Sequence, residues 1–90
     1  MTIKVYTAEG CSPCQAVKAG LSKQGYKIDG QRVEVVDVST DAGFDDFVKS
    51  VLAHGDGAVP SAFKDGQQCE ILLDDETGEV FLECPHSEDQ

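Results

Sequence analysis

Two cysteines separated by two residues, Cys11 and Cys14, lie between a strand-like segment and a helix-like segment. Residues 2–6 alternate in character, which is typical of a strand. Residues 12–24 have apolar positions at helical spacing, and Pro13 suits a first helical turn, where its missing N–H costs nothing. This junction constrains the fold most, because it fixes two sulfur atoms at the start of a helix that follows a strand.

Five further segments have the periodicity of regular structure. They are a strand at 31–39, a helix at about 41–54, and three short strands at 61–64, 69–73 and 79–84. The valines of the 31–39 segment point to both faces, as in a strand that is covered on both sides. The helix at 41–54 has five apolar residues at i, i+3, i+4, i+7 and i+8, which are Phe44, Phe47, Val48, Val51 and Leu52.

These elements predict an α/β fold of order β-α-β-α-β-β, with room for one more strand. A strand, helix and strand in succession need a crossover, so the first two strands should pair in parallel. The later strands add antiparallel pairs, with a hairpin turn at 65–66, and the sheet is therefore mixed. At 90 residues the chain has room for one core. We expect a single domain over 1–84 and a flexible tail at 85–90.

The charge of the chain limits its partners. The net charge of −10 repels phosphate backbones, so we expect no nucleic-acid binding. The sequence has no apolar run long enough to span a membrane and no secretory signal pattern, and we expect a cytoplasmic protein without membrane contact. Eight of the 17 acidic residues lie at 70–90, a segment without Lys or Arg.

The cysteine pair has the setting of a disulfide-exchange site. Cys11 precedes the helix, where backbone N–H groups and the helix dipole favour a thiolate, the nucleophilic form of cysteine. Cys14 lies one turn further on the apolar face and should be more buried, which suits it to resolve a mixed disulfide. A zinc site or an inert structural pair are the alternatives. Zinc is disfavoured because the chain has no second pair of this spacing.

The chain resembles the glutaredoxin and thioredoxin superfamily, and is most similar to small glutaredoxins and to the NrdH-like redoxins, including phage-encoded members. The residues that carry the resemblance are VYTAEGCSPC at 5–14, AVPSAF at 58–63 and DG at 65–66. The resemblance covers roughly residues 1–70. It implies a thioredoxin-like fold and a thiol-disulfide oxidoreductase that uses Cys11 as nucleophile and Cys14 as resolving thiol.

The resemblance also implies a substrate site and partners. It places Ser12 and Pro13 beside the substrate, and it implies a cis bond between Val59 and Pro60, with the Val59 backbone pairing with an extended peptide. No bound cofactor is implied. The expected partners are a disulfide-containing protein substrate, with ribonucleotide reductase as the family example, and either glutathione or a thioredoxin reductase as electron donor.

Several positions depart from the family pattern. Pro13, in the third position of the motif, resembles thioredoxins, the more strongly reducing members. Ala8 and Glu9 stand where glutaredoxins often have a basic residue, and Glu9 would disfavour a nearby thiolate. The Gly-Gly pair of glutathione-binding members is absent from residues 66–76, which makes a thioredoxin reductase a competitive alternative to glutathione as the reductant. The final family helix is replaced by turn and strand residues, so we expect an extra strand or hairpin there.

The C-terminal segment leaves several hypotheses open. A turn near 76–77 would place Leu73 opposite Val80, and Cys69 opposite Cys84. The two cysteines could form a disulfide or join His86 in a metal site, but the favoured interpretation is two buried apolar side chains. A sheet face without its helix suggests a homodimer. The alternative function is a binding module that acts on a partner protein through its acidic C-terminal hairpin.

Overall fold

The computed structural model describes residues 2–53, 57–64 and 66–84. The elements are β1 (Thr2–Thr7), α1 (Ser12–Lys23), β2 (Lys27–Ile28), β3 (Gln31–Asp37), α2 (Asp41–Phe47), a π-helical turn (Val48–Leu52), β4 (Ser61–Lys64), β5 (Gln67–Leu73) and β6 (Val80–Glu83). The strands of the described chain form one sheet in the order β2-β3-β1-β4-β5-β6. The predicted α/β class and the predicted mixed sheet are confirmed.

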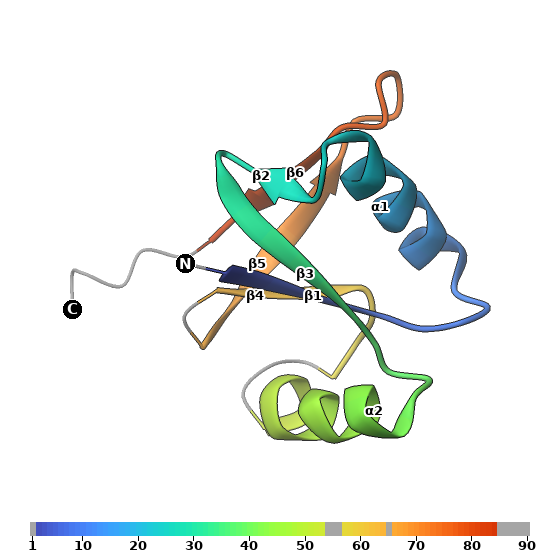
Figure 1. Cartoon of the computed structure of the whole chain (residues 1–90), viewed down its shortest axis with the longest axis vertical. Coiled ribbons are helices and arrows are strands. Elements are labelled where there is room, and N and C mark those ends of the chain that lie inside the picture. Colours follow the sequence, from blue (N-terminus) through green and yellow to red (C-terminus); the bar gives the residue numbers. More distant parts are fainter. Residues whose placement is uncertain (1, 54–56, 65, 85–90) are drawn as a thin grey trace.

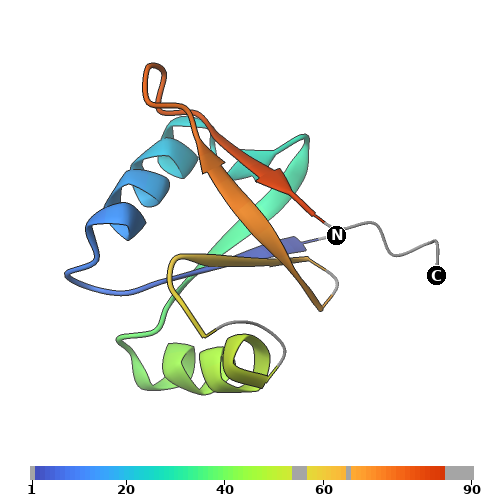
Figure 2. The same cartoon turned by 180° about the vertical axis from the view of Figure 1, so that it is seen from behind.

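The sheet combines one parallel pair with antiparallel pairs. β1 lies parallel to β3, with Val5 opposite Val35, and antiparallel to β4. β4 pairs with β5 and β5 with β6, both antiparallel, as the hairpin signals predict. In both views α1 and α2 lie on different sides of the strands (Figures 1 and 2). The crossover through α1 therefore gives the parallel pairing that the sequence order requires.

Two apolar clusters occupy the two faces of the sheet. On the α1 face, Val17 and Leu21 of the helix pack with residues such as Val5 and Val33 from the strands. On the other face lies a second cluster, made of Tyr6, Phe47, Val51 and Phe63. The valines of β3 divide between the clusters, with Val33 and Val35 on one face and Val36 on the other, together with Val38 just after the strand. The prediction of a strand covered on both faces is confirmed.

The short strand β2 was missed by the sequence analysis. It forms a two-residue hairpin with β3 through a turn at Asp29 and Gly30. Both residues have positive φ, 52° and 77°, as the two central residues of a type I′ hairpin turn require. The Asp-Gly dipeptide was the available signal, but a strand of two residues shows no periodicity by which to recognise it.

The helix predicted at 41–54 is confirmed over the described residues, but its second half is π-helical rather than α-helical. The α-helix ends at Phe47 and a π-helical turn covers Val48–Leu52, while residue 54 lies outside the described residues. Because the backbone hydrogen bonds change from the i→i+4 to the i→i+5 pattern, the apolar residues no longer share one face of the helix. Phe47 and Val51 are buried, but Phe44, Val48 and Leu52 remain exposed. The predicted apolar face of five residues therefore reduces to two.

A C-terminal hairpin closes the α1 face, where the family pattern has a helix. Val80 of β6 is 1% exposed and belongs to the α1-side cluster. The Gln24 side chain accepts a hydrogen bond from the Val80 N–H at 2.5 Å and donates to the Val80 carbonyl at 3.2 Å. Gly20 allows close contact, because a Cβ atom there would collide with the Gly78 carbonyl. The expected replacement of the helix by a hairpin is confirmed.

Two remaining expectations concern the ends of the chain and the membrane. The proposed tail at 85–90 lies outside the described residues, so its flexibility stays a prediction. Within the part of the chain that the structure describes, no helix is long and apolar enough to cross a membrane.

Candidate active site

Cys11 occupies the N-cap of α1, with extended backbone angles of φ −96° and ψ 109°. Its Sγ accepts a hydrogen bond from the Cys14 N–H at 3.2 Å. This N–H is one of the donors that the first turn of a helix leaves without an intrahelical partner. Sulfur at this place therefore receives both a hydrogen bond and the positive end of the helix dipole, and both favour a thiolate.

Cys14 lies one turn further along α1 and has no exposed surface, whereas Cys11 is half-buried. The two sulfur atoms are joined in a disulfide, with the Cα atoms 5.2 Å apart. The predicted difference in burial is confirmed. An incoming disulfide can reach Cys11, and Cys14 can react only with what is bound to Cys11.

The loop that carries Cys11 is fixed to the neighbouring β3 strand and the segment that follows it. The Thr7 carbonyl at the end of β1 accepts a hydrogen bond from the Val38 N–H at 2.8 Å. The Glu9 N–H donates to the Ser39 Oγ at 3.0 Å. The parallel β1–β3 pair thus sets where the loop leaves the sheet and where the first turn of α1 begins.

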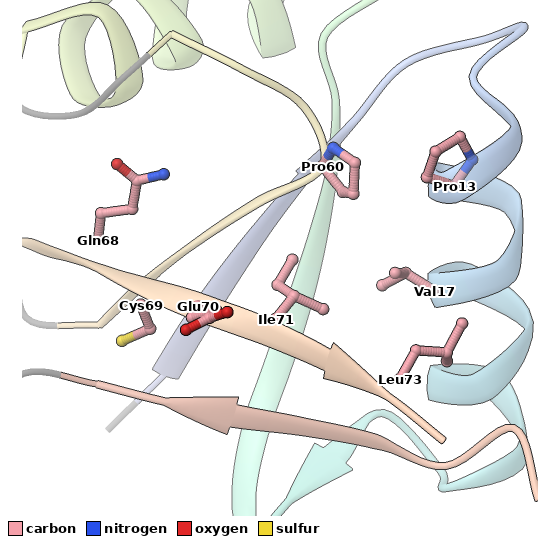
Figure 3. A pocket seen from close by; sticks show the side chains of 8 residues that line it. All are labelled: Pro13, Val17, Pro60, Gln68, Cys69, Glu70, Ile71 and Leu73. Carbon is pink, nitrogen blue, oxygen red and sulfur yellow. The ribbon is translucent and has the colours of Figure 1, made fainter. Parts of the chain in front are cut away.

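A groove of about 370 Å³ lies beside the first turns of α1 (Figure 3). Pro13 and Val17 of the helix and Pro60 of the loop before β4 line one part of it, and β5 lines the rest with Gln68, Cys69, Glu70, Ile71 and Leu73. The Val59–Pro60 peptide bond is cis, as expected. Pro13 and Pro60, far apart in sequence, are therefore brought together at one groove.

The other two residues that the family resemblance places beside the substrate are not among the described residues that line the groove. Ser12 is the exposed first residue of α1 and does not line the groove. The half-buried Val59 side chain packs against the second apolar cluster, which contains Tyr6 and Phe63. The β5 contribution was missed, because strand periodicity at 69–73 says nothing of what lies beside the strand.

A polar cluster fastens α2 to β1. Lys4 Nζ donates to Asp46 Oδ2 at 3.0 Å, and the Tyr6 hydroxyl donates to Oδ1 at 3.2 Å. Burial acts to raise the pKa of Asp46, but the hydrogen bonds and charge of Lys4, with the hydroxyls of Tyr6 and Ser50, outweigh it and lower that pKa. The hydrogen bond to Asp46 raises the pKa of Lys4 against the desolvation of that lysine. Burial raises the pKa of Tyr6.

Cys69 and Cys84 form a second disulfide, with Cα atoms 4.2 Å apart. The predicted register is correct, since Leu73 faces Val80. The favoured interpretation as two separate apolar side chains is wrong, because the two side chains converge and their sulfur atoms are bonded. The bond leaves neither cysteine as a thiolate for the hypothetical metal site, and His86 lies outside the described residues. The described side chains contain no cluster of three metal ligands.

Comparison with known proteins gives one finding. The Glutaredoxin family model matches residues 3–69, from β1 through both active-site cysteines and Pro60 into β5. The match ends at Cys69, so the turn and β6 lie beyond it. No curated protein matches the sequence.

Proposed function

This chain belongs to the glutaredoxin family and is a thiol-disulfide redox protein, and from that premise we propose that it reduces disulfides in protein substrates. The observation that carries the proposal is the geometry of the cysteine pair. Cys11 is half-buried at the N-cap of α1, and Cys14 lies fully buried within bonding distance of it. A reachable nucleophile with a shielded second thiol is what two-step disulfide exchange requires.

The exchange proceeds in two balanced steps. The Cys11 thiolate attacks one sulfur of the substrate disulfide, a mixed disulfide forms, and the other substrate sulfur leaves and takes up a proton. Cys14 then loses its proton and attacks the Cys11 Sγ, which releases the second substrate thiol. Two electrons have passed to the substrate, and the protein is left with the Cys11–Cys14 disulfide that the structure contains.

A reductant must return the pair to the dithiol, and we propose a thioredoxin reductase over glutathione. Gly66, immediately before β5, has a positive φ of 79°, and the sequence that follows lacks the Gly-Gly pair of glutathione-binding family members. By family analogy the substrate is a cytoplasmic protein such as ribonucleotide reductase, as for the phage-type redoxins. Neither a cofactor nor a metal has a role in this reaction scheme.

A coupled assay tests the proposal. NADPH oxidation is followed with a protein disulfide as substrate and with either thioredoxin reductase alone, or glutathione plus glutathione reductase. We expect turnover with thioredoxin reductase, and its loss in Cys11→Ser. The Cys14→Ser variant should trap substrates as mixed disulfides, and Cys11→Ser/Cys14→Ser is the matched control. Turnover by Cys11→Ser equal to that of the native protein would contradict the proposed mechanism.

The exposed side chains of the C-terminal hairpin favour a second candidate function, a binding module. Leu72 and Phe81 face each other across β5 and β6 and are 40% and 41% exposed. Such a surface suits a partner protein or a second copy of the chain. Retention of the cellular function in Cys11→Ser would favour this candidate, and light scattering of the purified protein tests the homodimer.

A further inference from the structure

A second cavity lies at the end of the sheet opposite the active site. It has a volume of about 200 Å³, and Ile3, Ile28 and Leu82 give it apolar walls. β2 and β6, the two edge strands of the described sheet, contact each other and both contribute to it. Ile3 lies near the start of β1, whereas the loop to Cys11 leaves from the end of that strand at Thr7. We call this space the β2–β6 cavity, and among the described residues that line it none belongs to the active site.

The Cys69–Cys84 disulfide can be reached from this cavity at one of its two sulfur atoms. Cys84 lines the cavity and is half-buried, whereas Cys69 is 4% exposed and is not among the lining residues. Figure 3 shows the Cys69 sulfur turned toward β6 and away from the two prolines of the active-site groove. Exchange requires a thiolate to attack one sulfur from the side opposite the other. Because β6 is an edge strand, the side of Cys84 that faces away from β5 is not covered by another strand of the described sheet.

Polar groups around the cavity lack partners among the described residues. The Gln31 Oε1 atom is buried and accepts no hydrogen bond. Within the described ranges, neither the half-buried Lys64 nor the exposed Asp29 makes an ion pair, and both line the cavity. A buried acceptor without a donor costs free energy, so the site favours a ligand that supplies an N–H group. The cavity therefore offers an acceptor, a cation and an anion beside a disulfide sulfur.

We propose that the β2–β6 cavity is a second exchange site, at which a small zwitterionic thiol, an α-amino acid such as free cysteine, exchanges with the Cys69–Cys84 disulfide. The ligand carboxylate pairs with Lys64, and the ligand ammonium group donates to Asp29 and to Gln31 Oε1. The volume of the cavity is below the roughly 300–1,000 Å³ of sites for drug-sized ligands, which favours an amino-acid-sized thiol over a peptide. A zwitterion has no net charge, so the net charge of −10 does not repel it as it repels an anionic thiol.

The exchange has two balanced steps. The ligand thiolate attacks the Cys84 Sγ, a mixed disulfide forms between the ligand and Cys84, and Cys69 leaves as a thiolate that takes up a proton. A second ligand thiolate then attacks the ligand sulfur of the mixed disulfide. This step releases the symmetric disulfide of the ligand, and the Cys84 thiolate takes up a proton. Two electrons pass from two ligand thiols to the protein, and the reverse reaction reduces the symmetric disulfide.

The test measures how fast different thiols open the Cys69–Cys84 bond in Cys11→Ser/Cys14→Ala protein, with alkylation and mass spectrometry as the readout. Cysteine has both charged groups, 3-mercaptopropionate only the carboxylate, cysteamine only the ammonium group, and 2-mercaptoethanol neither. The rate constants are compared at equal thiolate concentration. Each is divided by the rate constant of the same thiol with bis(2-hydroxyethyl) disulfide, and this normalised rate constant removes differences in intrinsic nucleophilicity.

The normalised rate constant should be about fivefold higher for cysteine than for 2-mercaptoethanol, and the first mixed disulfide should map to Cys84. Lys64→Gln should lower the value for 3-mercaptopropionate relative to cysteamine about threefold. Asp29→Asn should have the opposite effect of similar size, and asparagine tolerates the φ of 52° at that position. Lys18→Gln, the same change of charge on α1 outside the cavity, is the matched control and should keep the native values.

Contrary results have distinct meanings. Equal normalised rate constants for the four thiols would overturn the ligand class, because opening would then not depend on the charged groups of the thiol. Equal effects of Lys64→Gln and Lys18→Gln would exclude a contact between Lys64 and the ligand. A first mixed disulfide on Cys69 would refute attack from the cavity. The protein used here lacks both active-site cysteines, so failure of this inference leaves the proposed function intact, and failure of the proposed function leaves this site intact.

Discussion

The Cys69–Cys84 disulfide should supply a large share of the stability of the native protein. The bond closes a loop between two residues that are 15 apart in sequence. Because the bond removes loop-closure entropy from the unfolded chain, it contributes about 3 kcal/mol to the free energy of unfolding at 25 °C. A 90-residue domain has a total free energy of unfolding of about 5–13 kcal/mol. At an unfolding entropy of about 0.19 kcal/mol/K, 3 kcal/mol corresponds to a change of about 16 °C in melting temperature.

The measurement isolates this bond from the active-site bond. In a Cys11→Ser/Cys14→Ala background, thermal unfolding is followed by circular dichroism with and without a reductant. We expect the reductant to lower the melting temperature by about 16 °C. The same background with Cys69→Ala and Cys84→Ala should have the lower melting temperature both with and without the reductant. An unchanged melting temperature, with both thiols shown by mass spectrometry to be reduced, would refute the loop-closure reasoning.

Three further perturbations have defined outcomes in urea unfolding. Gln24→Ala should destabilise the protein by about 2 kcal/mol, because both Val80 backbone groups lose their partner, and Gln24→Glu is the control that keeps the acceptor. Gly20→Ala should destabilise it by at least about 1 kcal/mol, since a Cβ there meets backbone, and Ala19→Gly is the reverse change on an exposed position. Asp46→Asn should cost about 1 kcal/mol at pH 7. Because the folded pKa of Asp46 is lowered, this difference should vanish as pH falls through that pKa, and a pH-independent difference would contradict the assignment.

The active-site junction is the part that sequence reasoning predicted best. The strand, the cysteine pair and the helix depend on local properties, namely alternation at 2–6, a proline at the second helical position and apolar residues at helical spacing. Such properties act between near neighbours in the chain. They therefore predict where Cys11 caps the helix and which cysteine lies on the apolar face of the helix.

The C-terminal hairpin was predicted from the sequence only in part. A turn near 76–77 was sufficient to predict the register of β5 and β6, and with it the opposition of Cys69 and Cys84. Burial of two cysteines fits either free thiols or a bond, so periodicity does not distinguish them. The direction in which the side chains converge decides between the two, and that direction depends on how the sheet twists at its edge.

What the sequence by itself determined is the order and type of the main elements, the parallel pairing of β1 with β3, and the two reactive sulfur atoms. Only the tertiary structure decided the groove. It exists because β4 is shorter than β5, because Pro60 cannot continue the ladder, and because the first turns of α1 lie beside the gap. These three conditions join residues from distant parts of the chain, and a pattern confined to neighbouring residues contains no information about such distances.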